Sequence, residues 1–182
     1  MLTTSRLILR RWQPEDREPF AAMNADAEVM RYFPKLLDRV ESDVLAERID
    51  NHFAVHGFGA WAVGMRDAEP FVGFVGLMRP NFEAHFTPAV EVGWRLCRTA
   101  WGRGIATEAA AAALRYGFET LELREIVSFT VPANTRSLGV MQRLGMRRDP
   151  HGDFEHPRLP EGHAFRPHVL YRLARKAWSA AR

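Results

Sequence analysis

The sequence contains one cysteine, two lysines and no long apolar run. Because Cys97 has no second cysteine to pair with, an internal disulfide framework is excluded and a reducing compartment is indicated. The apolar cluster nearest the N-terminus, Leu7 to Leu9, is flanked by arginines and is too short for a signal-peptide core or a membrane span. We therefore expect a cytoplasmic protein without a membrane partner.

Two further patterns are missing, a run of positive charge and a metal-ligand spacing. Only Lys35 and Lys176 among the 25 basic residues are lysines, and the arginines are scattered along the chain. Nucleic-acid binding needs a clustered basic surface, so nucleic acid is not expected as a partner. His52 and His56 are four residues apart, but Phe53 stands where a zinc-binding His-Glu-x-x-His helix has glutamate. We expect no metal site.

The composition and length that remain are those of a globular protein. Apolar residues make up 47% of the 182 residues and charged residues 26%, which predicts one domain spanning 1–182. The spacing of apolar residues predicts a strand at 6–12, helices from Pro14, around 26–32 and at 40–56, strands at 61–65, 71–78 and 89–96, a helix ending near 121, a strand at 125–131, a helix at 134–145 and a closing strand at 169–173. This order predicts a mixed α/β fold with a largely antiparallel sheet.

The segment from Trp101 to Thr107 has the layout of a phosphate-binding turn. It joins a predicted strand to a predicted helix and contains Gly102 and Gly104. At such a turn, free backbone N–H groups and the positive end of the helix dipole face the ligand. The chain has no Gly-Lys pair, which excludes a P-loop, and Thr107 occupies the third glycine position of a dinucleotide fingerprint. A glycine turn selected only for tight packing stays open as the alternative.

This turn resembles the signature of the GNAT acetyltransferase superfamily, Gln/Arg-x-x-Gly-x-Gly/Ala. Gly104 and Ala106 fill the last two defined positions, and Trp101 replaces the usual Gln or Arg. The string Trp-Gly-Arg-Gly-Ile-Ala-Thr-Glu-Ala is similar to the RimJ/RimL-like branch, the ribosomal-protein N-terminal acetyltransferases and their relatives. Three other segments share the resemblance: Thr4-x-Arg6-Leu7-x-Leu9-Arg10, Asp26-x-x-Val29-Met30-x-Tyr32 and Asn134-x-x-Ser137-x-x-Val140-Met141-x-x-Leu144-Gly145.

The resemblance implies a GNAT fold of the α/β (α+β) class and acetyl-CoA as cosubstrate. In that fold a mixed, mostly antiparallel twisted sheet of about seven strands is flanked by helices, in the order β-α-α-α-β-β-β-α-β-α-β-β. By the family pattern, the cofactor contacts three consecutive strand residues, the glycine turn and one residue before a later helix. These residues are Trp94, Arg95, Leu96, Trp101, Gly102, Arg103, Gly104, Ile105, Ala106, Thr107 and Asn134. Arg98 and Arg103 could add charge beside the phosphates, or could simply be solvated.

Two residues are the candidates for catalysis. Glu91 lies on the strand face opposite Val90, Val92, Trp94 and Leu96, where a carboxylate could accept the amine proton directly or through water. A surface carboxylate is the alternative, and Glu83 and His85 in the preceding loop are the reserve candidates. Family members often use a tyrosine on the helix after Asn134 as the acid. This helix has none, so Ser137 becomes the candidate donor to the departing thiolate. The alternative is ordinary helix capping by Asn134, with Ser137 in the first turn.

The acceptor is less well defined by the sequence. By family analogy, Tyr32 and Phe33 border the acceptor site, on the side of the sheet opposite the cofactor. We expect an amine-bearing acceptor, either a protein N-terminus or a small molecule such as an aminoglycoside or polyamine, and a homodimer is compatible with the family. A noncatalytic acyl-CoA-binding sensor module is the competing function. Cys97 is expected to be a small buried hydrophobe and not a catalytic thiol.

Overall fold

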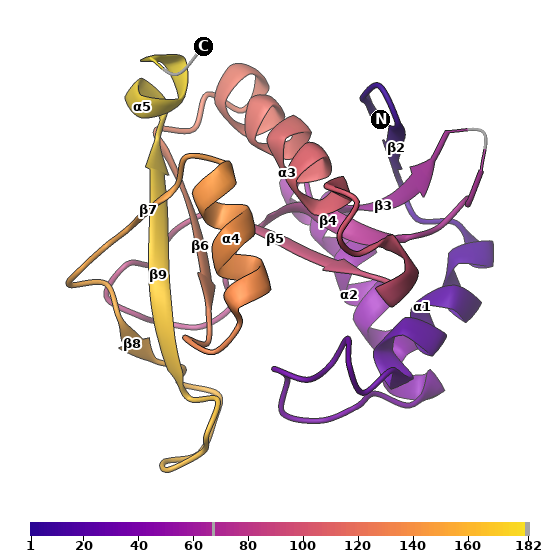
Figure 1. The fold of residues 1–182 in the computed structure, drawn as a ribbon, viewed down its shortest axis with the longest axis horizontal. Helices are drawn as coiled ribbons and strands as arrows, with labels where there is room; N and C mark the ends of the chain where they lie inside the picture. The colour runs from indigo at the N-terminus through magenta and orange to yellow at the C-terminus, as the bar shows by residue number, and fades with distance from the viewer. Residues whose placement is uncertain (67, 181–182) are drawn as a thin grey trace.

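A twisted sheet forms the centre of the protein (Figure 1). The computed structural model describes residues 1–66 and 68–180. The described residues form nine strands in the order β1-β2-β3-β4-β5-β6-β9-β7, with β8 paired to β9. They are β1 (Leu2–Thr3), β2 (Leu7–Arg10), β3 (Ala60–Met65), β4 (Gly73–Met78), β5 (Glu91–Leu96), β6 (Glu125–Thr130), β7 (Arg147–Arg148), β8 (Phe154–Glu155) and β9 (Pro167–Ala174). Every pairing is antiparallel except that of β5 with β6. The predicted mixed, mostly antiparallel sheet is confirmed, and short strands such as β1, β7 and β8 account for the higher strand number.

Helices cover both faces of this sheet. They are α1 (Arg17–Ala25), α2 (Arg39–His56), α3 (Ile105–Arg115), α4 (Thr135–Arg143) and α5 (Arg175–Ala180). Neighbouring residues of β3 belong to different cores: Ala60 and Ala62 share one with residues of α1 and α2, whereas Trp61 and Val63 share the other with residues of α3 and α4 and with Phe53 of α2. Because side chains alternate along a strand, the two cores lie on opposite faces of the sheet.

The helical expectations hold except at two places. The segment 26–32 forms turns and no helix: the Asp26 side chain accepts the main-chain N–H of Glu28, which offers the backbone an alternative to helical bonding. Residues 175–180, for which no helix was predicted, form α5. At α2, Asp38 and Glu41 make the reciprocal capping bonds and Gly57 ends the helix in the left-handed conformation.

The sheet separates where β5 meets β6. These two parallel strands share the single register pair Glu91↔Val127, and the Val127 N–H donates to the Val90 carbonyl at 2.9 Å. Main-chain polar groups alternate in direction along a strand, so those of Val92, Trp94 and Leu96 face the side away from β4. This stretch of β5 therefore has a strand partner on one side only, next to the N-terminus of α3 (Figure 1).

Candidate active site

The glycine turn uses backbone conformations that favour glycine. Gly102 has φ +72° and Gly104 has φ +76°, immediately before α3 begins at Ile105. A Cβ atom at Gly102 would meet nothing within 4 Å, and one at Gly104 would meet only the Arg6 guanidinium, at 3.5 Å. Tight packing is therefore not the reason for these glycines. Their left-handed conformation leaves an uncrowded surface at the N-terminus of α3, which suits an anion such as pyrophosphate.

The N-terminal Thr4-x-Arg6 motif braces this turn. Arg6 donates through Nη1 to the Arg103 carbonyl at 3.0 Å and through Nε to the Glu108 carboxylate at 2.7 Å. Thr4 donates to the same carboxylate at 2.5 Å. Because Glu108 lies in the first turn of α3, these bonds hold the turn against the helix and neutralise the one acid in that first turn. The sequence did not reveal this role for Arg6.

Trp101 fixes the start of the turn to the end of β5. Its indole N–H donates to the Leu96 main-chain carbonyl at 2.9 Å. This bond occupies one of the main-chain groups of β5 that face away from β4. The guanidinium of Arg136 lies 4.4 Å from the centre of the Trp101 ring. Arg103 in the turn and Arg136 beside it are exposed, whereas the exposed Arg98 lies 4.0 Å from the Asp26 carboxylate. Arg136, on α4, was not singled out from the sequence, because only the tertiary structure brings it to Trp101.

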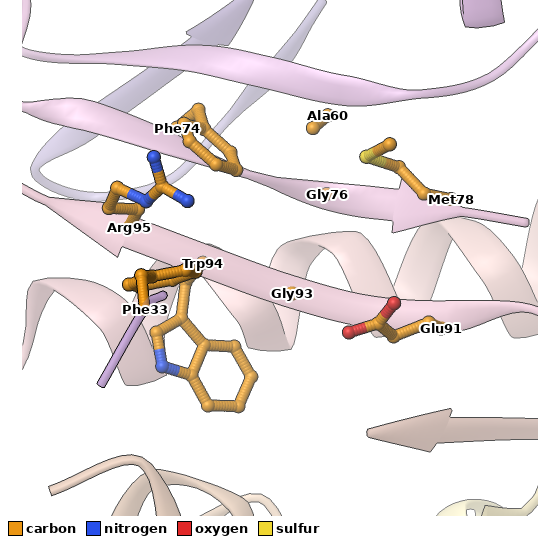
Figure 2. Close-up of a pocket in the computed structure, with 9 residues that line it drawn as sticks. All are labelled: Phe33, Ala60, Phe74, Gly76, Met78, Glu91, Gly93, Trp94 and Arg95. Atoms are coloured by element: carbon orange, nitrogen blue, oxygen red, sulfur yellow. The ribbon is translucent and has the colours of Figure 1, made fainter. Parts of the chain in front are cut away.

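Ser137 and Trp94 meet on the α3–α4 side of β5. The Trp94 indole N–H donates to the Ser137 hydroxyl oxygen at 3.3 Å, and Figure 2 shows the indole directed away from Arg95 and Phe33. Since a hydroxyl accepts and donates, this contact leaves the Ser137 O–H free to donate. Asn134 caps α4 by accepting the Ser137 main-chain N–H at 3.3 Å, and its amide nitrogen donates to Thr130 at 3.1 Å. The capping alternative is thus observed for Asn134.

A pocket lies on the opposite face of β5. It has a volume of about 160 Å³ and is lined by residues of β3, β4, β5 and the segment before α2: Phe33, Ala60, Phe74, Gly76, Met78, Glu91, Gly93, Trp94 and Arg95 (Figure 2). Gly93 and the small Ala60 add little side-chain volume to this pocket. A Cβ at Gly76 would lie 2.3 Å from the Gly59 carbonyl oxygen, whereas one at Gly93 would have the Glu91 carboxylate at 3.5 Å as its nearest contact.

Glu91 contributes the only carboxyl group among the residues that line this pocket. Burial among apolar neighbours raises the pKa of the Glu91 carboxyl to about 8. It lies at the single register pair between β5 and β6, where the unpaired stretch of β5 begins. A carboxyl group with a pKa near 8 can take up and release a proton at neutral to mildly alkaline pH, as a general base requires.

The chain's similarity to known proteins agrees with this geometry. The sequence profile of the acetyltransferase (GNAT) domain matches residues 6–147. This chain belongs to the GNAT acetyltransferase family.

Individual relatives are similar over nearly the full chain. Bacillus subtilis YnaD, named an uncharacterized N-acetyltransferase, is 28% identical over 178 residues, covering 98% of this chain and 99% of YnaD. The FsC-acetyl coenzyme A-N(2)-transacetylase of Aspergillus fumigatus is 30% identical, covering 97% of this chain and 77% of that protein. A GNAT acetyltransferase structure from Bacillus anthracis superposes with a TM-score of 0.78 at 25% identity, covering 96% and 98% of the two chains. The GNAT fold and an acetyl-CoA-dependent acyltransferase activity follow for this chain.

The GNAT fold places most of the predicted cofactor residues on one side of the sheet and one of them elsewhere. The turn 101–107 and the outward-facing groups of Trp94 and Leu96 adjoin each other at the N-terminus of α3. Arg95 was also predicted to contact the cofactor. Its side chain instead lies in the pocket on the opposite face, and its main chain is in register with Phe74 of β4. Side chains and main-chain groups alternate along β5, so Arg95 faces differently from Trp94 and Leu96 on either side of it.

The remaining candidates divide between the pocket and other places. Phe33 lines the pocket, whereas Tyr32 is not among its lining residues. Glu83 lines a second hollow with Phe82 and Thr87, so it is separate from Glu91. The ring of His85 packs against Phe86. The reserve candidates for the base thus lie outside the pocket that contains Glu91.

Two other side chains, those of Cys97 and His52, occupy structural positions in the GNAT domain. Burial raises the pKa of the Cys97 thiol, which keeps it protonated and unsuited to nucleophilic catalysis. His52 bonds the Phe58 carbonyl at 2.7 Å through Nδ1 and accepts the Arg79 N–H at 3.0 Å through Nε2. No group of three His, Cys, Asp or Glu side chains in the described part of the chain is arranged to hold a metal ion. Within residues 1–66 and 68–180, no helix is long and apolar enough to cross a membrane.

Proposed function

We propose that residues 1–182 act as one N-acetyltransferase domain that transfers acetyl directly to a primary amine, with Glu91 as general base. The observation that carries this proposal is the position of Glu91. Its carboxyl group faces a pocket on one side of β5, and the unpaired stretch of the same strand runs from Glu91 toward the glycine turn on the other side. An acceptor in the pocket and a cofactor along β5 would thus meet near residue 91.

The residues present fit acetyl-CoA along the unpaired side of β5. The main-chain groups of Val92 and Trp94 offer a strand edge to the amide groups of pantetheine. The turn 101–107 offers main-chain N–H groups at the N-terminus of α3 to the pyrophosphate, and Arg103 and Arg136 add positive charge beside it. When bound, acetyl-CoA supplies an acetyl group activated as a thioester.

The residues of this chain then perform two proton transfers. In its ionised form Glu91 accepts a proton from the acceptor ammonium or from the attacking amine, directly or through one water molecule. An α-amino group with a pKa of ~8 needs less help from this base than a lysine side chain with a pKa of ~10.4. The O–H of Ser137, left free by the bond from Trp94, donates to the departing thiolate. With an alkyl-thiol pKa of ~8.5, the thiolate needs only modest assistance.

The finer placement within the family is also part of the proposal. The string from Trp101 to Ala109, with Trp101 in place of Gln or Arg, supports the RimJ/RimL-like branch. In the structure Trp101 bonds the Leu96 carbonyl, a contact that gives this substitution a physical role. A cytoplasmic location is proposed from the single cysteine. A homodimer is compatible with the proposal but is not needed for the site.

Acetyl-CoA turnover with a panel of primary amines tests the activity. The purified protein is mixed with acetyl-CoA and each amine in turn: a short peptide with a free N-terminus, an aminoglycoside, a polyamine and simple alkylamines. Release of free thiol is followed by a colour reaction, and the acetylated amine is identified by mass spectrometry. We expect amine-dependent thiol release. Tight binding of acetyl-CoA without thiol release for any acceptor would favour the noncatalytic acyl-CoA-binding module instead.

A further inference from the structure

Arg95 is a cation in the wall of the pocket, and no acid among residues 1–66 and 68–180 forms a salt bridge with it. Its guanidinium carbon lies 4.1 Å from the centre of the Phe33 ring and 5.6 Å from that of the Phe74 ring. Figure 2 shows these three side chains at the same end of the pocket. No salt bridge joins Arg95 to an acid among the described residues, and its Nε atom is buried without a hydrogen-bond partner there. Buried cations are normally paired, because an unpaired charge in an apolar setting is strongly unfavourable.

A buried polar relay holds this guanidinium in place. The Asn24 side-chain oxygen accepts from Arg95 Nη1 at 2.6 Å, and the Asn24 amide nitrogen donates to the Ser42 hydroxyl at 3.2 Å. Asn24 and Ser42 both have 0% exposure. The main-chain carbonyl of Asn24 also accepts the main-chain N–H of Leu37 at 3.1 Å, and this bond ties α1 to the segment before α2. The relay orients Arg95 with neutral oxygen atoms, so it leaves the positive charge uncompensated.

The charges around the pocket favour an anion. Burial, together with the nearby positive charge of Arg48, lowers the pKa of Arg95 to about 10, so the guanidinium still carries its charge at neutral pH. The other ionisable group of the pocket, Glu91, has its pKa raised to about 8 and is mostly uncharged at pH 7. A polyamine would bring further positive charge to this wall. An acceptor with a negative group would instead supply the missing partner for Arg95.

We infer that Arg95 is the specificity residue of the acceptor site and binds a carboxylate at the far end of an elongated amino acid-like acceptor. This inference rests on the proposed function, since it assigns the substrate class of the same pocket. Arg95 and Glu91 are four residues apart on β5, which separates their Cα atoms by roughly 13 Å. The amine and the carboxylate therefore lie several bonds apart in the acceptor, with Gly93 leaving space for the chain between them. The flanking rings of Phe33 and Phe74 contact its apolar part.

A series of acceptors that differ only in the charge of the distal group tests this inference. The probes are 6-aminohexanoate, hexylamine and 1,6-diaminohexane, each assayed with acetyl-CoA for amine-dependent thiol release. We expect kcat/KM to be about 10- to 100-fold higher for 6-aminohexanoate than for hexylamine, the ratio expected of a hydrogen bond between charged groups. The diamine should be the poorest acceptor. Equal values for the three probes, or preference for the diamine, would overturn the role of Arg95 while leaving the acetyltransferase activity intact.

The variant Arg95→Gln identifies the residue responsible. It should raise KM for 6-aminohexanoate by about 10-fold or more, because the charged partner is lost, with little change in KM for hexylamine. Acetyl-CoA affinity and the thermal unfolding midpoint show whether the variant is folded. Arg95→Lys, which keeps the charge, should retain part of the preference, and it serves if the glutamine variant is unstable. An unchanged preference in both variants would refute the inference. No turnover of any probe by the wild-type protein would count against the proposed function itself.

Discussion

Replacing Glu91 with glutamine should make the protein more stable and less active at the same time. In the folded protein the carboxyl group stays protonated up to a pKa of about 8, whereas in the unfolded chain it ionises near the ordinary value of 4.5. Between these two pH values only the unfolded chain releases the proton. A raised pKa of this kind stabilises the folded state fully below pH 4.5, and the stabilisation is lost progressively as the pH rises to about 8.

The size of the effect follows from the width of that pH window. Each pH unit within it lowers the free energy of unfolding by about 1.4 kcal/mol, which gives roughly 3 kcal/mol at pH 7. Water at the open mouth of the pocket screens part of this effect, so we expect about 1 to 3 kcal/mol. Glutamine has nearly the same shape and cannot ionise. Glu91→Gln should therefore be more stable than the wild type by this amount at pH 7 to 8, and equal to it near pH 4.5.

Urea unfolding followed by tryptophan fluorescence, at several pH values between 4.5 and 8, measures this difference. Glu83→Gln is the matched control, because Glu83 is exposed in the loop before β5 and its replacement should change stability by no more than about 0.5 kcal/mol. In parallel, kcat should fall about 10²- to 10⁴-fold in Glu91→Gln while acetyl-CoA affinity stays unchanged. The wild-type rate should rise with pH up to about 8. A variant no more stable than the wild type at pH 8 would refute the reasoning, because the folded protein would then compensate the ionised carboxylate.

Three further predictions concern the turn, the thiolate and the pocket. Gly104→Asp should abolish acetyl-CoA binding through charge and bulk. The control Gly57→Asp, at φ +75° and with nothing within 4 Å of its Cβ position, carries the same backbone strain and should bind acetyl-CoA normally. Equal acetyl-CoA affinities of the two variants in isothermal titration would contradict the turn assignment. Ser137→Ala should lower kcat by less than about tenfold, since a thiolate with a pKa of ~8.5 leaves readily, and a larger loss in steady-state assays would assign Ser137 a greater role. Gly93→Val should raise KM for the amine without changing acetyl-CoA affinity, because its side chain would enter the pocket beside Glu91, and an unchanged KM would place the acceptor elsewhere.

Features that depend on neighbouring residues could be predicted from the sequence. The glycine turn before the helix at 105, the end of the preceding long helix at residue 56, and the alternation that puts Glu91 opposite Val92 are set by local backbone geometry. The turns at 26–32 were mistaken for a helix because the apolar spacing did not include the competing bond from the Asp26 side chain.

The tertiary structure decided everything that depends on residues far apart in the chain. The raised pKa of Glu91 comes from desolvation in the pocket that residues of β3, β4 and β5 line, and the unpaired side of β5 comes from the single register pair with β6. The bond between Asn24 and Arg95 joins residues separated by 71 positions, so no local pattern could indicate it. The sequence by itself determined the family and predicted the cofactor turn, because both depend on short motifs. The charge of the pocket lined by Glu91 and Arg95 was decided by packing, because burial and long-range contacts determine which charges have a partner.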